Sequence, residues 1–132
     1  MKDSYNELYP FQSLPPAVRT VSANGAQADL KGFQKATVVV SVGEYTDGTH
    51  ALTVEESAAS GSGFTTVVAG DLLGTLPTIS QAGDDNQDYK IGYIGTKRYL
   101  RAVVTVTGGP STGCALGASI VRGYKHHNPT TL

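Results

Sequence analysis

The histidines are the first residues in this chain whose type suggests chemistry, but their spacing does not support a metal site. His126 and His127 are adjacent, so on an extended chain their rings point to opposite faces and chelate poorly. Zinc-type sites need further ligands, and none lies at a suitable spacing nearby. We therefore expect both histidines in a solvated tail or at an interface. His50 follows a turn and is expected to be a hydrogen-bonded hairpin residue.

The carboxylates do not form a recognisable catalytic or metal-binding pattern. The acidic loop that contains Asp84, Asp85 and Asp88 offers oxygen ligands of the kind that Ca²⁺ prefers, but it lacks the EF-hand spacing. We interpret this loop as a solvated turn. Glu55 and Glu56 are consecutive, so on a strand they point to opposite faces and cannot act on one substrate as a glycosidase pair.

Nucleophilic and nucleotide-dependent chemistry has no signature either. The single cysteine, Cys114, stands in a run of small residues and is expected to be a buried apolar side chain. There is no Gly-x-Ser-x-Gly elbow, no P-loop and no dinucleotide fingerprint. The sequence therefore predicts a protein that is not an enzyme and that uses no cofactor and no metal.

Composition limits the class of protein further. The 132 residues include 16 glycines and no tryptophan, only 16% are charged, and the net charge is -1. This is the composition of one β-rich domain with many tight turns. A net charge this small argues against a nucleic-acid partner that is bound through its phosphates. It also argues against binding to a charged membrane surface. The N-terminus has no signal-peptide pattern, so we expect a soluble protein made in a cytoplasm.

Alternating apolar residues predict the strands. The residues from 88 to 107 form two such runs around a short break at Gly95, and Ala36 to Val42 is a third, valine-rich run. The expected strands are 17–23, 26–31, 35–43, 49–57, 63–69, 87–94, 98–107 and 114–123. About eight short strands without a convincing helix predict an all-β fold, an antiparallel β-sandwich of jelly-roll type.

The first 16 residues differ from the rest and predict an arm. Tyr5, Leu8, Tyr9, Phe11 and Leu14 stand among polar residues without a period, and three prolines prevent a continuous helix. We interpret 1–16 as an extended N-terminal arm that docks on a neighbouring subunit, 17–125 as the β-sandwich domain and 126–132 as a C-terminal tail. On this division, deletion of 1–16 should leave a folded domain and abolish assembly.

The basic residues concentrate near one predicted hairpin. Lys90, Lys97, Arg98 and Arg101 lie in or beside it, flanked by two tyrosines. One reading is contact with an acidic protein surface. The other is that the arginines lie over the tyrosine rings and cap the edge of the sandwich. The residues alone leave both readings open.

Several stretches of the chain resemble a known group of proteins. The chain is similar to small proteins encoded beside the major capsid genes of tailed bacteriophages over about residues 28–127. The matching stretches are Val42–His50, Leu52–Ser57, Asp71–Gly74, Tyr89–Arg101, Val103–Gly108 and Gly123–His126.

The resemblance implies a structural protein of the virion. It implies a capsid cement or decoration protein that stabilises the head lattice, located on the capsid surface after synthesis in the host cytoplasm. The implied partners are the major capsid protein and further copies of the chain, as a homodimer or homotrimer; no membrane and no direct nucleic-acid contact are expected. The candidate residues for capsid or subunit interfaces are Tyr5, Leu8, Tyr9, Phe11, Leu14, Lys97, Arg98, Arg101, His126 and His127.

Two alternative functions stay open at this point. One is a head–tail connector or tail completion protein, which would be present in few copies per virion. The other is a carbohydrate-binding β-sandwich on the virion surface, in which Tyr45, Tyr89, Tyr93 and Tyr99 would stack on sugar rings.

Overall fold

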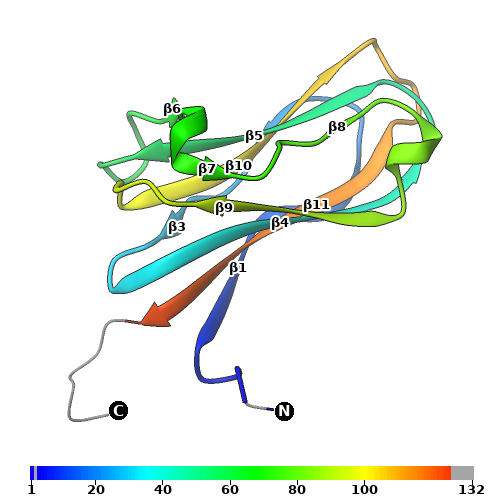
Figure 1. Ribbon diagram of the computed structural model, residues 1–132. Coiled ribbons are helices and arrows are strands. Elements are labelled where there is room, and N and C mark those ends of the chain that lie inside the picture. Colours follow the sequence, from blue (N-terminus) through cyan, green and yellow to red (C-terminus); the bar gives the residue numbers. More distant parts are fainter. Residues whose placement is uncertain (2, 126–132) are drawn as a thin grey trace.

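Two antiparallel β-sheets packed face to face make up the molecule (Figure 1). The computed structural model describes Met1 and residues 3–125. The first sheet has the order β1 (Leu8–Arg19), β11 (Cys114–Lys125), β4 (Phe33–Tyr45), β9 (Gln87–Tyr93) and β7 (Leu72–Leu73). The second has the order β2 (Ala23–Asn24), β10 (Tyr99–Thr107), β5 (Thr49–Ser57) and β6 (Thr65–Thr66), with β3 (Ala28–Asp29) beside β10 and β8 (Thr78–Ile79) beside β5.

The strand order is that of a jelly roll. β1 pairs with β11, β2 and β3 pair with β10, β4 pairs with β9, and β5 pairs with β6 and β8. The chain is thus one long hairpin, which coils so that β11 also pairs with β4 and β10 with β5. With β2 and β3 counted together, and likewise β6 and β8, this gives eight strands, which is the expected number, although the first two differ in position from the predicted 17–23 and 26–31; β7 is an additional short strand. The prediction of an all-β, antiparallel, jelly-roll-like sandwich is confirmed.

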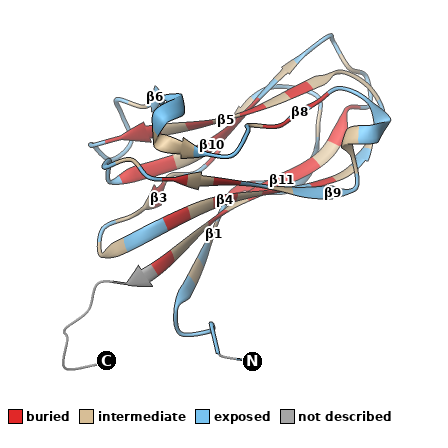
Figure 2. Cartoon of the chain, viewed as in Figure 1, coloured by how far each residue is buried: buried red, intermediate tan, exposed pale blue. Residues whose placement is uncertain are grey.

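Alternation along the strands builds the core between the sheets. Val38 and Val40 of β4, Leu100 and Val104 of β10 and Ile120 of β11 are all at most 1% exposed. Buried positions therefore face one another across the sandwich, as Figure 2 shows in red. Each such side chain contributes about 1.5–3 kcal/mol of burial free energy. This core explains why the chain folds without a disulfide bond; Cys114 is a free, fully buried cysteine, as expected.

The N-terminal segment departs from the predicted arm. Residues from Leu8 onward form β1, an edge strand paired with β11 over its length, with register shifts on either side of Leu14. Prolines at 10, 15 and 16 are compatible with an edge strand because only one side of such a strand must supply hydrogen-bond donors. The expected boundary between 16 and 17 therefore lies inside a strand, and only the residues before Leu8 project beyond the sheet (Figure 1).

Ser13 attaches β1 to the second sheet. Its hydroxyl donates to the carbonyl oxygen of Ala26 at 2.8 Å and accepts from the N–H of Ala102 at 3.0 Å. Its own carbonyl accepts from the N–H of Ala26 at 2.8 Å. Gly25 lies so close that a Cβ there would overlap the serine side chain. β1 is therefore held by both sheets: it pairs with β11 in the first sheet and is bonded through Ser13 to the second.

The short strands were the least predictable part of the fold. The dipeptide Asn24-Gly25 favours a two-residue hairpin turn, which would join the predicted strands 17–23 and 26–31. That hairpin does not form, because Asn24 instead pairs with Val103 of β10. The turn expected before His50 does form, at Asp47 and Gly48, with Gly48 at φ +86° between β4 and β5. The only helical segments among the described residues are two 3-10 turns, η1 (Ala69–Asp71) and η2 (Ala82–Asp84). Neither has the length or the hydropathy that crossing a membrane requires.

Candidate functional site

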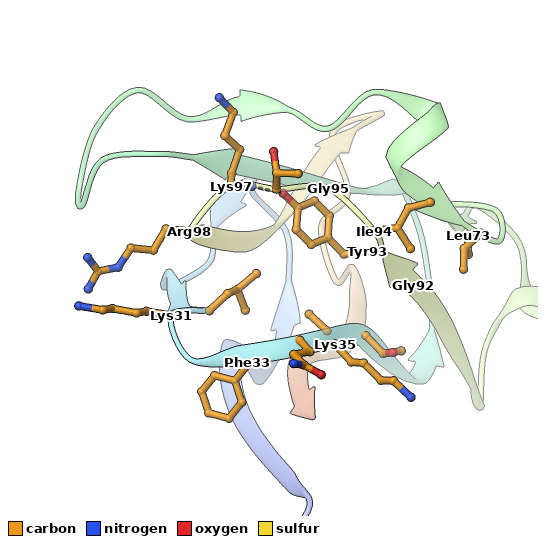
Figure 3. A pocket seen from close by; sticks show the side chains of 15 residues that line it. Lys31, Phe33, Lys35, Leu73, Gly92, Tyr93, Ile94, Gly95, Lys97 and Arg98 are labelled. Carbon is orange, nitrogen blue, oxygen red and sulfur yellow. Dashed lines mark hydrogen bonds between the residues drawn. The ribbon is translucent and has the colours of Figure 1, made fainter. Parts of the chain in front are cut away.

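A groove of about 880 Å³ opens at the end of the sandwich where β4 begins and β9 ends (Figure 3). Apolar residues of β4, β9, β7 and the loop from β9 to β10 line the groove. Phe33 stands at the start of β4, Tyr93 ends β9, and Ile94 follows in the loop to β10. Leu73 of β7 lies at one side and is 59% exposed. A volume of this size accommodates a short peptide segment or a small molecule.

Four cationic residues line this groove, and no acidic residue does. Lys31 comes from the corner that leads into β4, Lys35 from the first residues of β4 itself, and Lys97 and Arg98 from the loop before β10. Arg98 donates two hydrogen bonds of 2.9 Å to the carboxylate of Asp29 at the rim. That hydrogen bonding lowers the pKa of Asp29 to about 2. The groove thus combines an apolar lining with a cationic rim.

Tyr93 holds the cationic loop in place. Its hydroxyl accepts from the N–H of Lys97 at 3.0 Å and donates to a carboxylate oxygen of Glu56 at 3.4 Å. Burial raises the pKa of the Tyr93 hydroxyl, so the phenol stays protonated. A side chain at Gly95 would collide with the Tyr93 ring, and therefore only glycine allows the loop to fold over it.

Arg122 supports the groove from below, a role that the sequence reasoning missed. Its guanidinium donates to the carbonyl oxygens of Tyr9 at 3.2 Å and Asp29 at 3.1 Å. It also lies 4.7 Å from the ring centroid of Phe33 and 5.6 Å from that of Phe11. This one side chain connects β1, β3 and the start of β4, so it fixes Phe33 where it lines the groove.

The basic residues singled out from the sequence separate in the structure. Lys97 and Arg98 line the groove, and Arg98 also lies 5.0 Å from the ring of Tyr99. Arg101 does not line it: its guanidinium bonds Glu55 at 2.6 and 2.8 Å and covers the ring of Phe64 at 4.1 Å. The expected packing of arginine on an aromatic ring therefore occurs, but for Arg101 the ring belongs to a phenylalanine.

The expected N-terminal anchors also divide into two groups. Tyr5 is 87% exposed and Leu8 is 47% exposed, so both remain available to a partner. Tyr9 packs on Phe33 at a centroid distance of 5.2 Å, and Phe11 lies under Arg122. Leu14 is 1% exposed and belongs to the core of its own domain. The remaining two candidates, His126 and His127, lie outside the described residues.

The opposite end of the sandwich is acidic. Asp47, in the turn from β4 to β5, accepts hydrogen bonds from the N–H groups of Ser111, Thr112 and Gly113. These bonds, that of Gly113 foremost, lower the pKa of Asp47 below 3.8. Asp85 accepts from the N–H of Tyr45 at 3.0 Å. Both carboxylates therefore hold loops together.

The acidic loop expected to be a solvated turn has a structural role as well. Asp84 accepts from the N–H of Ser80 at 3.1 Å, while Asp88 at the start of β9 is exposed. Over Met1 and residues 3–125, no three His, Cys, Asp or Glu side chains are grouped as metal ligands. Glu55 and Glu56 face opposite sides of β5, Glu55 toward Arg101 and Glu56 toward Tyr93.

The tyrosines named for sugar stacking do not form an exposed platform. Tyr93 and Tyr99 are at most 9% exposed. Tyr45 is half-buried and donates to the carbonyl oxygens of Gly48 and Ser80, and half-buried Tyr89 donates to that of Asp84. These hydroxyls hold the loops of the acidic end. The four tyrosines named for sugar stacking therefore have structural roles within the fold and do not form a sugar-binding surface.

Phe33, Lys31 and Lys35 are the groove residues that sequence reasoning did not select. Two lysines around Gly32 and Phe33 were a visible signal of a basic corner. The pairing of Ala36 with Tyr93 is what carries that corner to the loop at Lys97, and no local pattern encodes such a pairing. Comparison with protein-family models and with curated proteins finds no match for this chain.

Proposed function

We propose that this protein is a structural component of a bacteriophage virion, a cement or decoration protein that binds the capsid surface and stabilises the head lattice. The main support for this proposal is the exposure of apolar side chains in the segment before β1. This segment projects from the jelly roll (Figure 1) and exposes Met1 and Tyr5, and Leu8, the first residue of β1, is exposed next to it. Apolar side chains exposed in this way are typical of a surface that a partner covers. The resemblance to proteins encoded beside phage capsid genes supports the same conclusion.

The outer face of the first sheet offers a second contact surface. A shallow trough of about 540 Å³ crosses β1, β11 and β4, and no charged residue lines it. Small or uncharged side chains form it, including Gln12, Ser41 and Ala115, with Val18 at one side. A flat neutral face can pack on a lattice while the N-terminal segment reaches a neighbouring capsid subunit. Two weak contacts then act together, which raises the overall affinity.

Binding to capsids tests this function directly. Purified protein is added to expanded phage heads that lack decoration, and saturation of binding and the temperature of head disruption are measured. We expect saturable binding and a higher disruption temperature. Tyr5→Ser combined with Leu8→Ser should weaken binding without unfolding the protein, because both side chains lie outside the core. Heads that neither bind the protein nor gain heat resistance would exclude the cement role.

Copy number separates this role from the connector alternative. A cement protein occupies a lattice and is present at on the order of hundreds of copies per virion, whereas a neck component forms a single closed ring of about six or twelve copies. Quantitative mass spectrometry of purified virions gives this number. A count near one ring per particle would assign the protein to the neck or tail.

A further inference from the structure

The charges of this protein are separated along β4. The cationic groove lies at the start of that strand, at Phe33, and the acidic loop lies at its end, where the N–H of Asn86 donates to the carbonyl oxygen of Gly43. A strand from Phe33 to Tyr45 spans about 40 Å. Within the net charge of -1, the groove lysines thus lie at one end of β4 and the carboxylates of the acidic loop at the other. We call the groove the cationic pole and the acidic loop with Glu44 the acidic pole.

The cationic pole keeps unpaired charge. Lys31 and Lys97 are exposed, and neither ammonium forms an ion pair within 4 Å among the described residues. In Figure 3 the Lys31, Lys97 and Arg98 side chains extend outward around the apolar lining. Arg98 is already bound to Asp29, so the lysines supply the attraction for a further anion.

The acidic pole keeps unpaired charge too. Glu44 and Asp88 are exposed and have no hydrogen-bond or ion-pair partner in the part of the chain that the structure describes. Asp84 and Asp85 stand between them and use an oxygen each on a backbone N–H. Arg19, whose carbonyl group lies beside Gly113 at this end, donates from its side chain to the carbonyl oxygen of Pro15.

We propose that the cationic groove binds the acidic loop, residues 82–88 with Glu44, of a second copy of this chain. A single copy cannot make the contact, because β4 holds its two poles apart. The N-terminal segment is a weaker candidate occupant. Lys2 offsets its acidic residues, and the Asp3 carboxylate already bonds the N–H of Tyr5 and the amide of Asn6.

This contact joins different surfaces of the two copies. Such a heterologous interface produces a ring if the rotation between neighbours closes, and a filament if it does not. Because the attraction is between exposed charges, it weakens as salt screens it. The inference does not rest on the virion role, since it concerns the purified protein alone.

Two charge-reversal variants test the contact. The groove variant carries Lys31→Glu and Lys97→Glu, and the loop variant carries Glu44→Lys and Asp88→Lys; none of these side chains holds another element of the fold. Sedimentation velocity at about 0.05 M and 1 M salt measures association of the full-length chain. We expect the wild type to self-associate at low salt, and each variant alone to bind itself at least about tenfold more weakly.

The decisive sample is the equimolar mixture of the two variants. Each groove then meets a loop of opposite charge, so the mixture should regain the wild-type association. Lys90→Glu is the matched control, because Lys90 is exposed on β9 and does not line the groove. Circular dichroism confirms that every variant is folded.

Three results would overturn the proposal. One is a wild type that stays monomeric at low salt up to millimolar concentration. Another is association that the groove variant retains. The third is association lost in the groove variant but kept in the loop variant, which would assign the groove to another acidic segment. Failure to bind capsids, by contrast, affects only the proposed function.

Discussion

At the scale of single residues, Asp47 determines how the loops at the acidic end respond to pH. Its carboxylate accepts the N–H groups of Ser111, Thr112 and Gly113, and these bonds favour the charged form. The pKa of Asp47 is consequently lower in the folded protein than the ordinary value of 3.8. A carboxyl group with a depressed pKa stabilises the fold above its unfolded pKa, and this contribution is lost as the pH falls through the folded pKa.

Asp47→Asn should therefore lower the thermal unfolding temperature at pH 7, and the difference from wild type should shrink below about pH 3.8. The reason is that the Asp47 carboxyl is protonated first in the unfolded chain and, at lower pH, in the folded protein as well. Thermal unfolding between pH 7 and pH 2 measures the effect. Asp88→Asn is the control and should change little at any pH. A difference that stays constant down to pH 2 would show that the charge of Asp47 is irrelevant.

Substitution of Gly113 tests the backbone conformation of the same loop. Gly113 has φ +87°, and a Cβ there would overlap the carbonyl oxygen of Arg19. Gly109 has φ +59° with open space around it. Denaturant unfolding should show that Gly113→Ala costs about 3 kcal/mol or more, since strain and overlap add. Gly109→Ala should cost about 1–2 kcal/mol, for strain alone. Equal costs would place the overlap in doubt.

At the scale of elements, β1 decides which part of the N-terminus is dispensable. Residues 1–7 precede the first strand pair, which joins Leu8 to Gly123. Deletion of 1–7 should leave the unfolding temperature nearly unchanged. Deletion of 1–16 removes Ser13 and buried Leu14 and exposes β11, at a cost of several kcal/mol, which approaches the whole stability of a domain. Calorimetry of both truncations distinguishes this from an arm that ends at residue 16.

The same strand shows where sequence reasoning succeeds and where it fails. Strict alternation predicted β4, β5, β10 and β11, because a strand with one buried face has apolar residues at every second position of its sequence. β1 was missed because its apolar residues have no clear period and its prolines exclude a helix and a central strand, while an edge strand, which tolerates prolines, was not considered. β2 and β3 are two residues long and exist only because β10 lies beside them. Such strands have no local signal to read.

The groove illustrates the corresponding limit for sites. Lys97 and Arg98 were selected because they stand together in the sequence. Lys31 and Lys35 join them through the pairing of β4 with β9, and Arg122 supports the lining from β11. A cluster assembled from three distant segments depends on topology. Local charge counting therefore found only part of it.

At the scale of the whole molecule, the first strand pairs with the last. β1 cannot pair until β11 has been made. The other pairs between long strands, β4–β11, β4–β9 and β5–β10, also join segments that are distant in the sequence. Proteins dominated by such pairings fold slowly. We expect refolding in milliseconds to seconds with one cooperative transition, measured by stopped-flow tyrosine fluorescence. Complete refolding within microseconds would contradict this expectation.

The three prolines of β1 have a consequence for storage and expression. They remove the N–H groups at 10, 15 and 16 from a strand that would otherwise be an open template for other chains. The side chain of Arg19 also occupies the carbonyl oxygen of Pro15. Pairing of this edge with a strand of another chain, the contact on which amyloid-type polymerisation depends, is thereby disfavoured. We therefore expect concentrated samples to resist aggregation through this edge, and contacts between copies to use side-chain surfaces.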